Sequence, residues 1–466
     1  MSRDVLTLKE VFVFIKMRFV SRPLLLSLFT VVLSSLADGQ TGCLNSDREL
    51  KLTFTGDIMC DLPQIPLVLD GHRSFDEMFE DVLPLFQNAD YVIGNLETPL
   101  AGEAARYTYK RFNFNSPDSF AEALRLCGFD FLTTANNHCL DRGEAGLDAT
   151  VKTLDRLGIR HDGTYFTIED SERINIVCLK GVKIAILSFC YGTNASNGIK
   201  LKKREWKIAL TKRPWWCTDV KSKQHNRSSE RKMIPERIRN WIRTCLPMRM
   251  IKAVRTHGDV LHKCRQYDVR IDHVVPSAIT NIADLAVLDK CLKKVRRAKQ
   301  IADLVVVCPH LGGQYNPAPG DYQKFVTSKF IEAGADLLVE NHSHNPLQGR
   351  WAETGCFVAF SLGNFVRTPY LSGWVNGTMS EYSILLNVHV DVRTKRLNRI
   401  TYSVLKSVIE KDGFAKVVPV SELYTRAVND EERQRLRVEN EAVVNRFVGG
   451  TLDVPILDEY TYPGPL

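Results

Sequence analysis

The amino-acid sequence predicts an α/β fold in which helices cover a β-sheet. Short runs rich in β-branched and aromatic residues recur along the chain, and amphipathic stretches separate several of them. The composition is that of an ordinary globular protein, because 44% of the 466 residues are hydrophobic and 25% are charged. Such an alternation of strands and helices is typical of a sheet covered by helices.

The predicted strands begin shortly after residue 50. The first is the run Leu-Thr-Phe-Thr at residues 52–55, which leads directly into Gly56 and Asp57. The remaining strands are predicted at residues 91–94, 129–134, 183–189, 303–308, 335–339, 357–361 and 382–390.

The clearest predicted helix covers residues 143–158. Leu147, Val151 and Leu154 recur there at three- and four-residue spacing, and Gly158 is placed to end the helix. A further helix is expected from Asp430, followed by an irregular, proline-containing end. Similar amphipathic patterns predict helices at residues 74–87, 116–126, 284–300 and 321–333.

Residues 1–37 resemble a secretory signal. Basic residues precede an apolar run at residues 24–36, and Ser35 and Ala37 supply the small residues before a cleavage site. This pattern predicts a secreted or extracytoplasmic protein cleaved after Ala37. The long basic region leaves two alternatives open: translation begins at Met17, or an uncleaved signal anchor tethers the protein to the membrane, although the apolar run is short for a membrane span.

The net charge of +8 is concentrated in one segment. Residues 200–270 hold 21 Lys/Arg and 6 Asp/Glu, so the rest of the chain, with 41 basic and 48 acidic residues, is slightly acidic. This asymmetry excludes a uniformly basic nucleic-acid binder, and no nucleic-acid partner is expected. We interpret residues 194–270 as a basic insertion containing four tryptophans. It is either a solvated lobe with its own small core or a contact surface for an anionic polymer or a membrane.

The twelve cysteines all follow the proposed cleavage site, and no two have Cys-x-x-Cys spacing. Their even number permits disulfides in an exported protein, and their spacing argues against a zinc ribbon or a thioredoxin-type redox site.

Residues that can bind a metal stand immediately after five of the predicted strands. Carboxylate, amide and imidazole groups occur there together, a combination that suits zinc, manganese or iron. In open α/β sheets, ligands bind at the carboxyl ends of strands. Two ions about 3.5–4 Å apart can polarise a phosphoryl oxygen and activate water, so the pattern predicts a two-metal hydrolase. The short motifs that carry it are Gly56-Asp57, Asn95-Leu96-Glu97, Asn136-Asn137-His138, His310-Leu311-Gly312 and His342-Ser343-His344.

These motifs, in this order and followed by Ser361-Leu-Gly-Asn-Phe, resemble the capsule-synthesis protein CapA family, which is associated with poly-γ-glutamate production. The family fold is similar to that of the calcineurin-like metallophosphatases, so the resemblance implies a four-layer αββα sandwich interrupted by the basic insertion. It covers about residues 50–190 and 275–370. The implied organisation is a family domain at residues 48–193 and 271–410, with a C-terminal helical tail at residues 411–466.

The resemblance also implies roles for individual residues. Asp57 and His344 would bind a first divalent ion, and Glu97 would be a carboxylate ligand or a bridge. A second ion would be bound by Asn137, His310 and His342, while His138 faces the substrate as a general acid or hydrogen-bond donor.

Asp141 has two interpretations, because it stands three residues after His138 and just before the helix predicted from Gly143. It either orients the His138 imidazole or caps the helix.

The chain departs from the expected pattern at several positions. No imidazole follows Asp57, and Asn95 stands where metallophosphatases commonly have a bridging aspartate. Gln314 replaces the carboxylate usual in the family after the first histidine motif, and Glu340-Asn341 replaces the usual Gly-His. The number of bound metals and the turnover are therefore left open.

Two functions are consistent with the sequence. The first is a metal-dependent hydrolase or transferase that acts on a phosphoester or an anionic polymer such as poly-γ-glutamate. The second is a non-catalytic factor that binds, exports or assembles a polyanion through the basic segment. The sequence contains no Gly-x-Ser-x-Gly elbow and no Walker-type phosphate loop, so polymer synthesis would require other subunits.

Overall fold

The computed structural model describes residues 48–109, 112–194, 198–214, 282–368 and 379–465. The chain divides into two units, residues 1–49 and 50–466. The expected signal at residues 1–37 lies outside the described residues, as does most of the basic insertion. None of the helices in the described ranges is long and apolar enough to cross a lipid bilayer.

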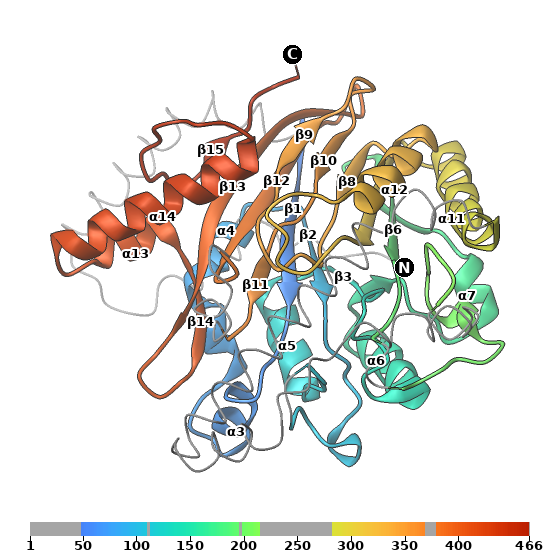
Figure 1. The fold of residues 1–466 in the computed structure, drawn as a ribbon, viewed down its shortest axis with the longest axis horizontal. Coiled ribbons are helices and arrows are strands. Elements are labelled where there is room, and N and C mark those ends of the chain that lie inside the picture. Colours follow the sequence, from blue (N-terminus) through green and yellow to red (C-terminus); the bar gives the residue numbers. More distant parts are fainter. Residues whose placement is uncertain (1–47, 110–111, 195–197, 215–281, 369–378, 466) are drawn as a thin grey trace, which may run out of the picture. The chain divides into compact units, whose positions relative to one another are not determined.

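In the described part of the chain, the larger of two sheets has nine strands (Figure 1). Strands β1, β2, β3 and β4 run parallel to one another, and β11 pairs with β1 while β15 pairs with β13. In sheet order the strands are β14 (Ala415–Pro419), β13 (Arg396–Ile409), β12 (Tyr382–Asp391), β1 (Glu49–Ile58), β2 (Tyr91–Leu96), β3 (Phe131–Thr133) and β4 (Arg160–Asp162), with β11 (Asn364–Val366) and β15 (Tyr460–Thr461) beside this row.

Among the described residues the second sheet has six strands, and its central strands are also parallel. Strands β6, β7, β8 and β10 share one direction, and antiparallel strands close both edges. In order they are β5 (Asn175–Leu179), β6 (Val182–Cys190), β7 (Leu304–His310), β8 (Leu337–Val339), β10 (Phe357–Ala359) and β9 (Gly349–Trp351).

The two sheets face each other across the largest apolar core. Phe54 and Ile93 of the first sheet share this core with Ile184 and Val306 of the second. Burial of such side chains is the main stabilising contribution to the fold, at about 25 cal/mol per Å² of apolar surface. Helix α14 (Asp430–Val448), preceded by α13 (Val420–Arg426), adds Phe447 to the same core.

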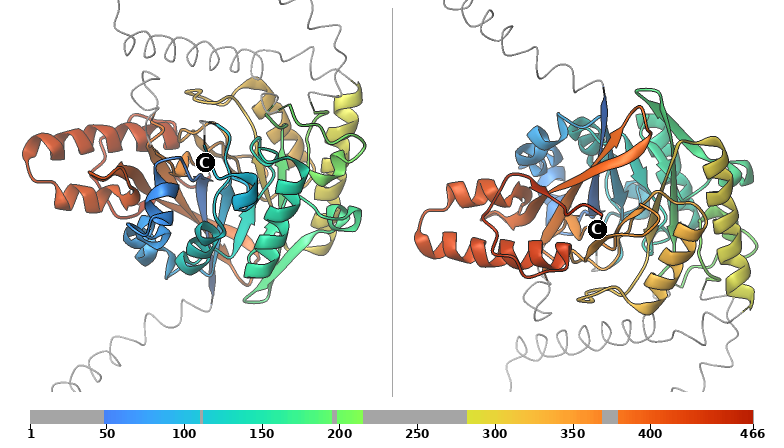
Figure 2. Two further views of the ribbon diagram at one scale, coloured as in Figure 1. Left: turned by 90° about the horizontal axis from the view of Figure 1, so that it is seen from below. Right: turned by 90° about the horizontal axis from the view of Figure 1, so that it is seen from above.

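Helices cover the outer faces of both sheets. On the nine-stranded sheet, α5 (Asp118–Cys127) packs Phe120 and Leu124 against the outer core, with the short elements α3 (Gln64–Leu69), η1 (Phe75–Met78), η2 (Glu80–Val82) and α4 (Leu83–Phe86) alongside. On the six-stranded sheet, α11 (Ile282–Ile301) and α12 (Asp321–Glu332) bury Val295 and Phe330. Figure 2 shows these two helical groups on opposite flanks. The predicted α/β class and the four-layer αββα arrangement are confirmed.

Helix α6 (Gly143–Leu157) matches its predicted bounds closely and ends at Gly158, which adopts a left-handed conformation. The helix expected over residues 74–87 is instead divided among η1, η2 and α4. A capping box formed by Ser74 and Glu77 closes the first turn, and Pro84 lacks the backbone N–H that a continuous helix would need. Three further helical elements are short: η3 (Glu103–Ala105), α7 (Ile168–Glu172) and η5 (Glu205–Lys207).

The described start of the basic segment, residues 198–214, is packed onto the body of the protein. Leu201, Ile208 and Leu210 join a small apolar cluster with helix α6. Lys207 is buried and forms an ion pair with Asp148 of that helix. The alternatives of a solvated lobe and a polyanion surface were drawn for residues 194–270, and residues 215–270 of that insertion lie outside the described ranges.

Eight of the twelve cysteines lie in the described ranges, and all eight are free thiols. All but Cys178 are buried, and burial raises the pKa of Cys139 and of Cys291 to about 12. Apolar packing rather than disulfides therefore holds these cysteines in place.

Strands β1 and β11 approach so closely beside Asp57 that residue 56 must be glycine. A Cβ added at Gly56 would lie 1.9 Å from the carbonyl oxygen of Gly363, and that oxygen accepts a hydrogen bond from the Asp57 amide at 2.9 Å. We expect Gly56→Ala to lower the free energy of unfolding by about 3 kcal/mol, because backbone rather than a flexible side chain would have to move. Urea denaturation would measure this effect. Gly450→Ala, whose Cβ would make only ordinary contacts at 3.9 Å with Val448 and 4.0 Å with Leu452, is the control, and equal stability of the two variants would contradict the expectation.

Candidate functional site

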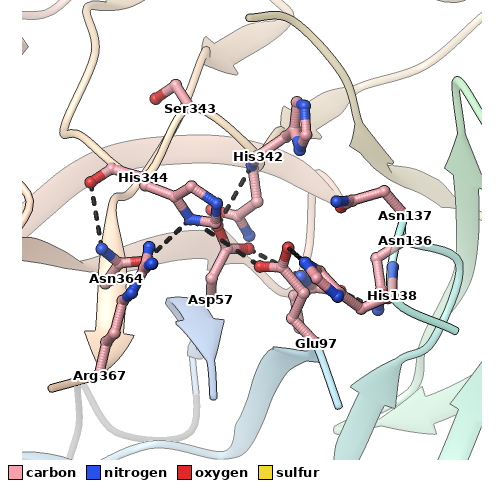
Figure 3. Close-up of polar contacts among 12 residues, drawn as sticks. Asp57, Glu97, Asn136, Asn137, His138, His342, Ser343, His344, Asn364 and Arg367 are labelled. Atoms are coloured by element: carbon pink, nitrogen blue, oxygen red, sulfur yellow. Dashed lines mark hydrogen bonds and ion pairs between the residues drawn. The ribbon is translucent and has the colours of Figure 1, made fainter. Parts of the chain in front are cut away.

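Polar residues from both sheets meet at the carboxyl ends of their parallel strands (Figure 3). Asp57 lies near the end of β1 and His310 is the last residue of β7, while the other residues stand in the loops that follow β2, β3 and β8. The structure brings together every residue that the sequence nominated, and all are buried: Asp57, Glu97, Asn137, His138, Asp141, His310, His342 and His344.

Two groups of potential metal ligands share one carboxylate. Asp57, Glu97 and His344 form the first group, and Glu97, His310 and His342 form the second; within each group the ligand atoms lie within 4.8 Å of one another. A carboxylate common to two such groups can bridge two ions, which matches the role that the resemblance implies for Glu97.

The second group contains a close pair of imidazoles. His310 Nε2 lies 3.0 Å from His342 Nδ1 and 3.5 Å from Glu97 Oε1. The amide oxygen of Asn137 approaches the same His310 nitrogen to 2.8 Å. Two nitrogens and two oxygens therefore converge on one point, a donor set that suits a borderline transition-metal ion.

The loop after β8 turns sharply to direct its two histidines inward. His342 and His344 have φ values of 108° and 58°, which are uncommon for residues other than glycine. Residues two apart on an extended strand would share one face, whereas here each imidazole joins a different group. Strained backbone of this kind persists where the surrounding structure holds it in place.

Beneath this loop, Glu340 fixes the backbone. Its carboxylate accepts hydrogen bonds from Gln323 Nε2, at 2.7 Å, and from the Thr327 hydroxyl, both on α12. Burial raises the Glu340 pKa to about 8. Glu340 replaces the glycine usual in the family, and its place beneath the loop indicates a structural role rather than a role as metal ligand.

Glu97 is an incompletely satisfied carboxylate. Both of its oxygens are buried, and neither has a hydrogen-bond partner among the described residues. Burial, together with the neighbouring Asp57 charge, raises its pKa to about 8. A buried carboxylate is stable only when it is paired, protonated or bound to a cation. A divalent ion in each group would supply the missing partner, so the residues present fit a metal centre.

The pKa values of the other groups also favour metal binding. Burial alone would raise the pKa of Asp57, but a hydrogen bond from His344 and the nearby imidazoles lower it overall. Burial lowers the pKa of His310 to about 4 and that of His342 well below its usual value. The last two imidazoles are therefore neutral near pH 7, which is the form that binds metal.

His138 forms a pair with Asp141 at the edge of the cluster. Its Nδ1 donates to the Asp141 carboxylate at 2.6 Å, and its Nε2 lies 4.0 Å from Glu97. Burial lowers the pKa of His138, but the Asp141 charge and hydrogen bond raise it overall. Asp141 also accepts from the Phe114 amide, and the N-cap of α6 is Arg142. Asp141 is thus placed to orient the imidazole, and it does not cap the helix.

Two asparagines to which the sequence reasoning gave no role hold the ligands in place. Asn95 donates to Asp57 Oδ1 at 2.7 Å and lies 3.3 Å from His310 Nδ1. Asn364 accepts from His344 Nδ1 at 2.9 Å and donates back to the His344 carbonyl. Such partners fix the orientation of metal ligands. The Ser361-Leu-Gly-Asn-Phe motif contained the signal for Asn364, and Asn95 was noted only as a departure.

Arg367 is a third residue that the sequence reasoning did not single out. It follows β11, is 4% exposed and donates from Nη1 to the Tyr315 hydroxyl at 2.8 Å. Burial lowers its pKa, but the nearby Tyr315, Asp61 and Glu97 raise it overall, so the guanidinium stays charged.

The chain is similar to proteins of bacterial capsule synthesis. The profile of the bacterial capsule synthesis protein PGA_cap matches residues 51–369. The capsule biosynthesis protein CapA of Bacillus anthracis is 24% identical over 347 residues, which cover 74% of this chain and 64% of that protein. The PGA biosynthesis protein CapA of Bacillus subtilis (strain 168) is 24% identical over 349 residues, 74% of this chain and 69% of that protein.

Among solved structures, the chain has a weak similarity to a crystal structure described as a novel phosphatase from Mycoplasma pneumoniae. The TM-score is 0.38 at 13% identity, and the match covers 77% of this chain and 94% of that one. The family profile, in contrast, covers well over half of the chain and includes every residue of the two ligand groups. The protein therefore belongs to the bacterial capsule synthesis protein family.

Proposed function

We propose that the protein is a metal-dependent hydrolase with two divalent ions bound at the cluster described above. The observation that carries this proposal is the pair of buried ligand groups that share Glu97. A structural metal site has no need of a second group, nor of an adjacent proton-transfer pair such as His138 and Asp141.

Different residues of the chain would bind the metal ions and transfer the proton. Asp57 and His344 would hold one ion, and His310, His342 and Asn137 would hold the other, while Glu97 belongs to both ligand groups. When bound, the ions polarise the substrate oxygen and lower the pKa of a water molecule. His138, held by Asp141, donates a proton to the leaving group from its Nε2.

The substrate class that we propose is a phosphoester or an anionic polymer. Membership of the capsule synthesis family supports a polymer, and the curated relatives are described as capsule and PGA biosynthesis proteins. We further propose that the protein is exported through residues 1–37 and works beside polymer-synthesis machinery. We also propose that residues 200–270 contact a membrane surface.

Elemental analysis by mass spectrometry, on protein purified without chelators, tests the centre directly. We expect two equivalents of zinc, manganese or iron, together with hydrolysis in a screen of phosphoesters and γ-glutamyl polymers. Protein that contains no metal and binds none on addition would contradict the proposal, and non-catalytic polyanion binding would then be the better explanation.

Metal removal is expected to lower the thermal unfolding midpoint by about 5 °C or more. Asp57 and Glu97 would lose their counter-charges, and a ligand present at a hundred times its Kd stabilises by about 2.7 kcal/mol. Differential scanning calorimetry before and after chelation would measure the shift. Zinc or manganese should restore the midpoint, whereas calcium, which prefers all-oxygen sites, should not. An unchanged midpoint after verified metal removal would contradict the expectation.

A further inference from the structure

Arg367 is a buried cation beside the metal ligands. It lies one residue after β11, and Figure 3 shows its side chain directed from that strand toward the cluster. Its charge acts on Glu97, where it lowers the pKa that burial raises. Its guanidinium carbon lies 6.0 Å from the ring centres of both Phe112 and Tyr315.

The guanidinium uses little of its hydrogen-bonding capacity. In the described part of the chain its one hydrogen bond joins Nη1 to Tyr315, and its buried Nε has no partner. A buried arginine is ordinarily fixed by a carboxylate that accepts two parallel hydrogen bonds. Here no described residue accepts a hydrogen bond from the edge formed by Nε and Nη2, so this edge is available to a ligand.

An exposed aromatic residue, Phe112, lies beside the Arg367 guanidinium. Phe112 is 39% exposed and has a φ of 58°, and its neighbour Phe114 packs edge-on against His138 with ring centres 4.5 Å apart. Arg367 is therefore close both to an exposed aromatic side chain and to Glu97, so a substrate that approaches the ligands from the side of Phe112 would meet its guanidinium.

We propose that Arg367 binds an oxyanion of the substrate and determines specificity for anionic substrates at the metal centre. The Nε–Nη2 edge would accept two oxygens of one phosphoryl or carboxylate group, a geometry that lysine cannot reproduce. Tyr315 positions the guanidinium through Nη1. This inference rests on the proposed function, because the oxyanion is placed relative to the two ligand groups.

Inorganic phosphate is the probe for this site. Isothermal titration calorimetry on the metal-loaded protein would compare the wild type with Arg367→Gln and Arg367→Lys, and elemental analysis would follow the metal in each. We expect the Gln variant to bind phosphate at least about tenfold more weakly and the Lys variant about threefold more weakly, both with full metal content. Arg350→Gln removes a charge from an exposed arginine of β9 and should not change the affinity. Glutarate in place of phosphate distinguishes a carboxylate from a phosphoryl site.

The outcomes separate this inference from the proposed function. If the wild-type protein contains no metal and binds none, both the proposed function and the role of Arg367 are contradicted. Metal-loaded wild type that does not bind phosphate or glutarate overturns the role of Arg367 alone, as do unchanged affinities in the variants. Loss of metal together with phosphate would mean that Arg367 supports the ligands, and it would also overturn the inference. If the Gln variant does not fold, the phosphate affinity of the Lys variant tests the inference, because lysine keeps the charge and most of the side-chain volume.

Discussion

Replacing Glu97 with glutamine is expected to remove metal from both positions and to reduce hydrolysis at least about a thousandfold. Glu97 is the one residue common to the two ligand groups. An amide has the same shape but carries no charge, so it cannot bridge two cations. Metal ions supply several kcal/mol of transition-state stabilisation, and each 1.4 kcal/mol is about tenfold in rate. Elemental analysis and turnover of the best substrate from the screen would measure both effects.

The control for this variant is Glu332→Gln. Glu332 is exposed and pairs with Lys329 on α12, so its loss should change neither metal content nor rate. Because both oxygens of Glu97 lack hydrogen bonds within the described residues, Glu97→Gln should fold when metal is withheld. A folded variant that keeps two equivalents of metal would show that Glu97 does not bridge.

The second large effect is expected at His138, and it separates proton transfer from metal binding. His138→Ala should lower kcat by about 10²- to 10⁴-fold, the usual contribution of a general acid, while metal content stays at the wild-type level. His138 belongs to neither ligand group, which is why the two readouts should separate. Asp141→Asn should cause a smaller loss, because the imidazole remains but its orientation is no longer fixed by a charged partner.

Steady-state kinetics and elemental analysis on these two variants provide the test. Loss of metal in His138→Ala would show that His138 is a metal ligand. An unchanged kcat would show that His138 does not take part in proton transfer. A substrate whose leaving group needs no protonation serves as the control, because His138→Ala should hydrolyse it at nearly the wild-type rate.

The central elements of the fold could be predicted because their patterns are local. Helix α6 carries its apolar spacing and its terminal glycine in the sequence, and β6, β7 and β12 are strongly apolar runs. Edge and surface strands could not be predicted in the same way. Strand β13 pairs with β12 and β14 through short connections, but it also pairs with β15, which lies far along the chain. Strands β14 and β15 lie in a segment that was expected to be a helical tail. The helix expected over residues 74–87 failed because Pro84 and a capping box favoured short turns.

The candidate site was predictable to the level of residue type. Acidic, amide and imidazole groups placed after strands indicated a metal centre and named the residues that the structure brings together. The residues that were missed, Asn95, Asn364 and Arg367, act on other side chains, and neither spacing nor residue type reveals such contacts. Asp141 shows the same limit, since the interpretation as a helix cap and the interpretation as a partner of His138 fit the sequence equally well.

The sequence by itself determined the α/β class, the family and the ligand types, because these depend on local hydropathy and short motifs. Only the tertiary structure decided that Glu97 belongs to both ligand groups and that the turn after β8 sends His342 and His344 to different groups. It also decided that Arg367 reaches the cluster with an Nε that has no hydrogen-bond partner among the described residues. The physical reason is that these properties are distances of a few ångströms between atoms far apart along the chain. Such distances are set by the packing of two sheets against each other, and no local pattern encodes them.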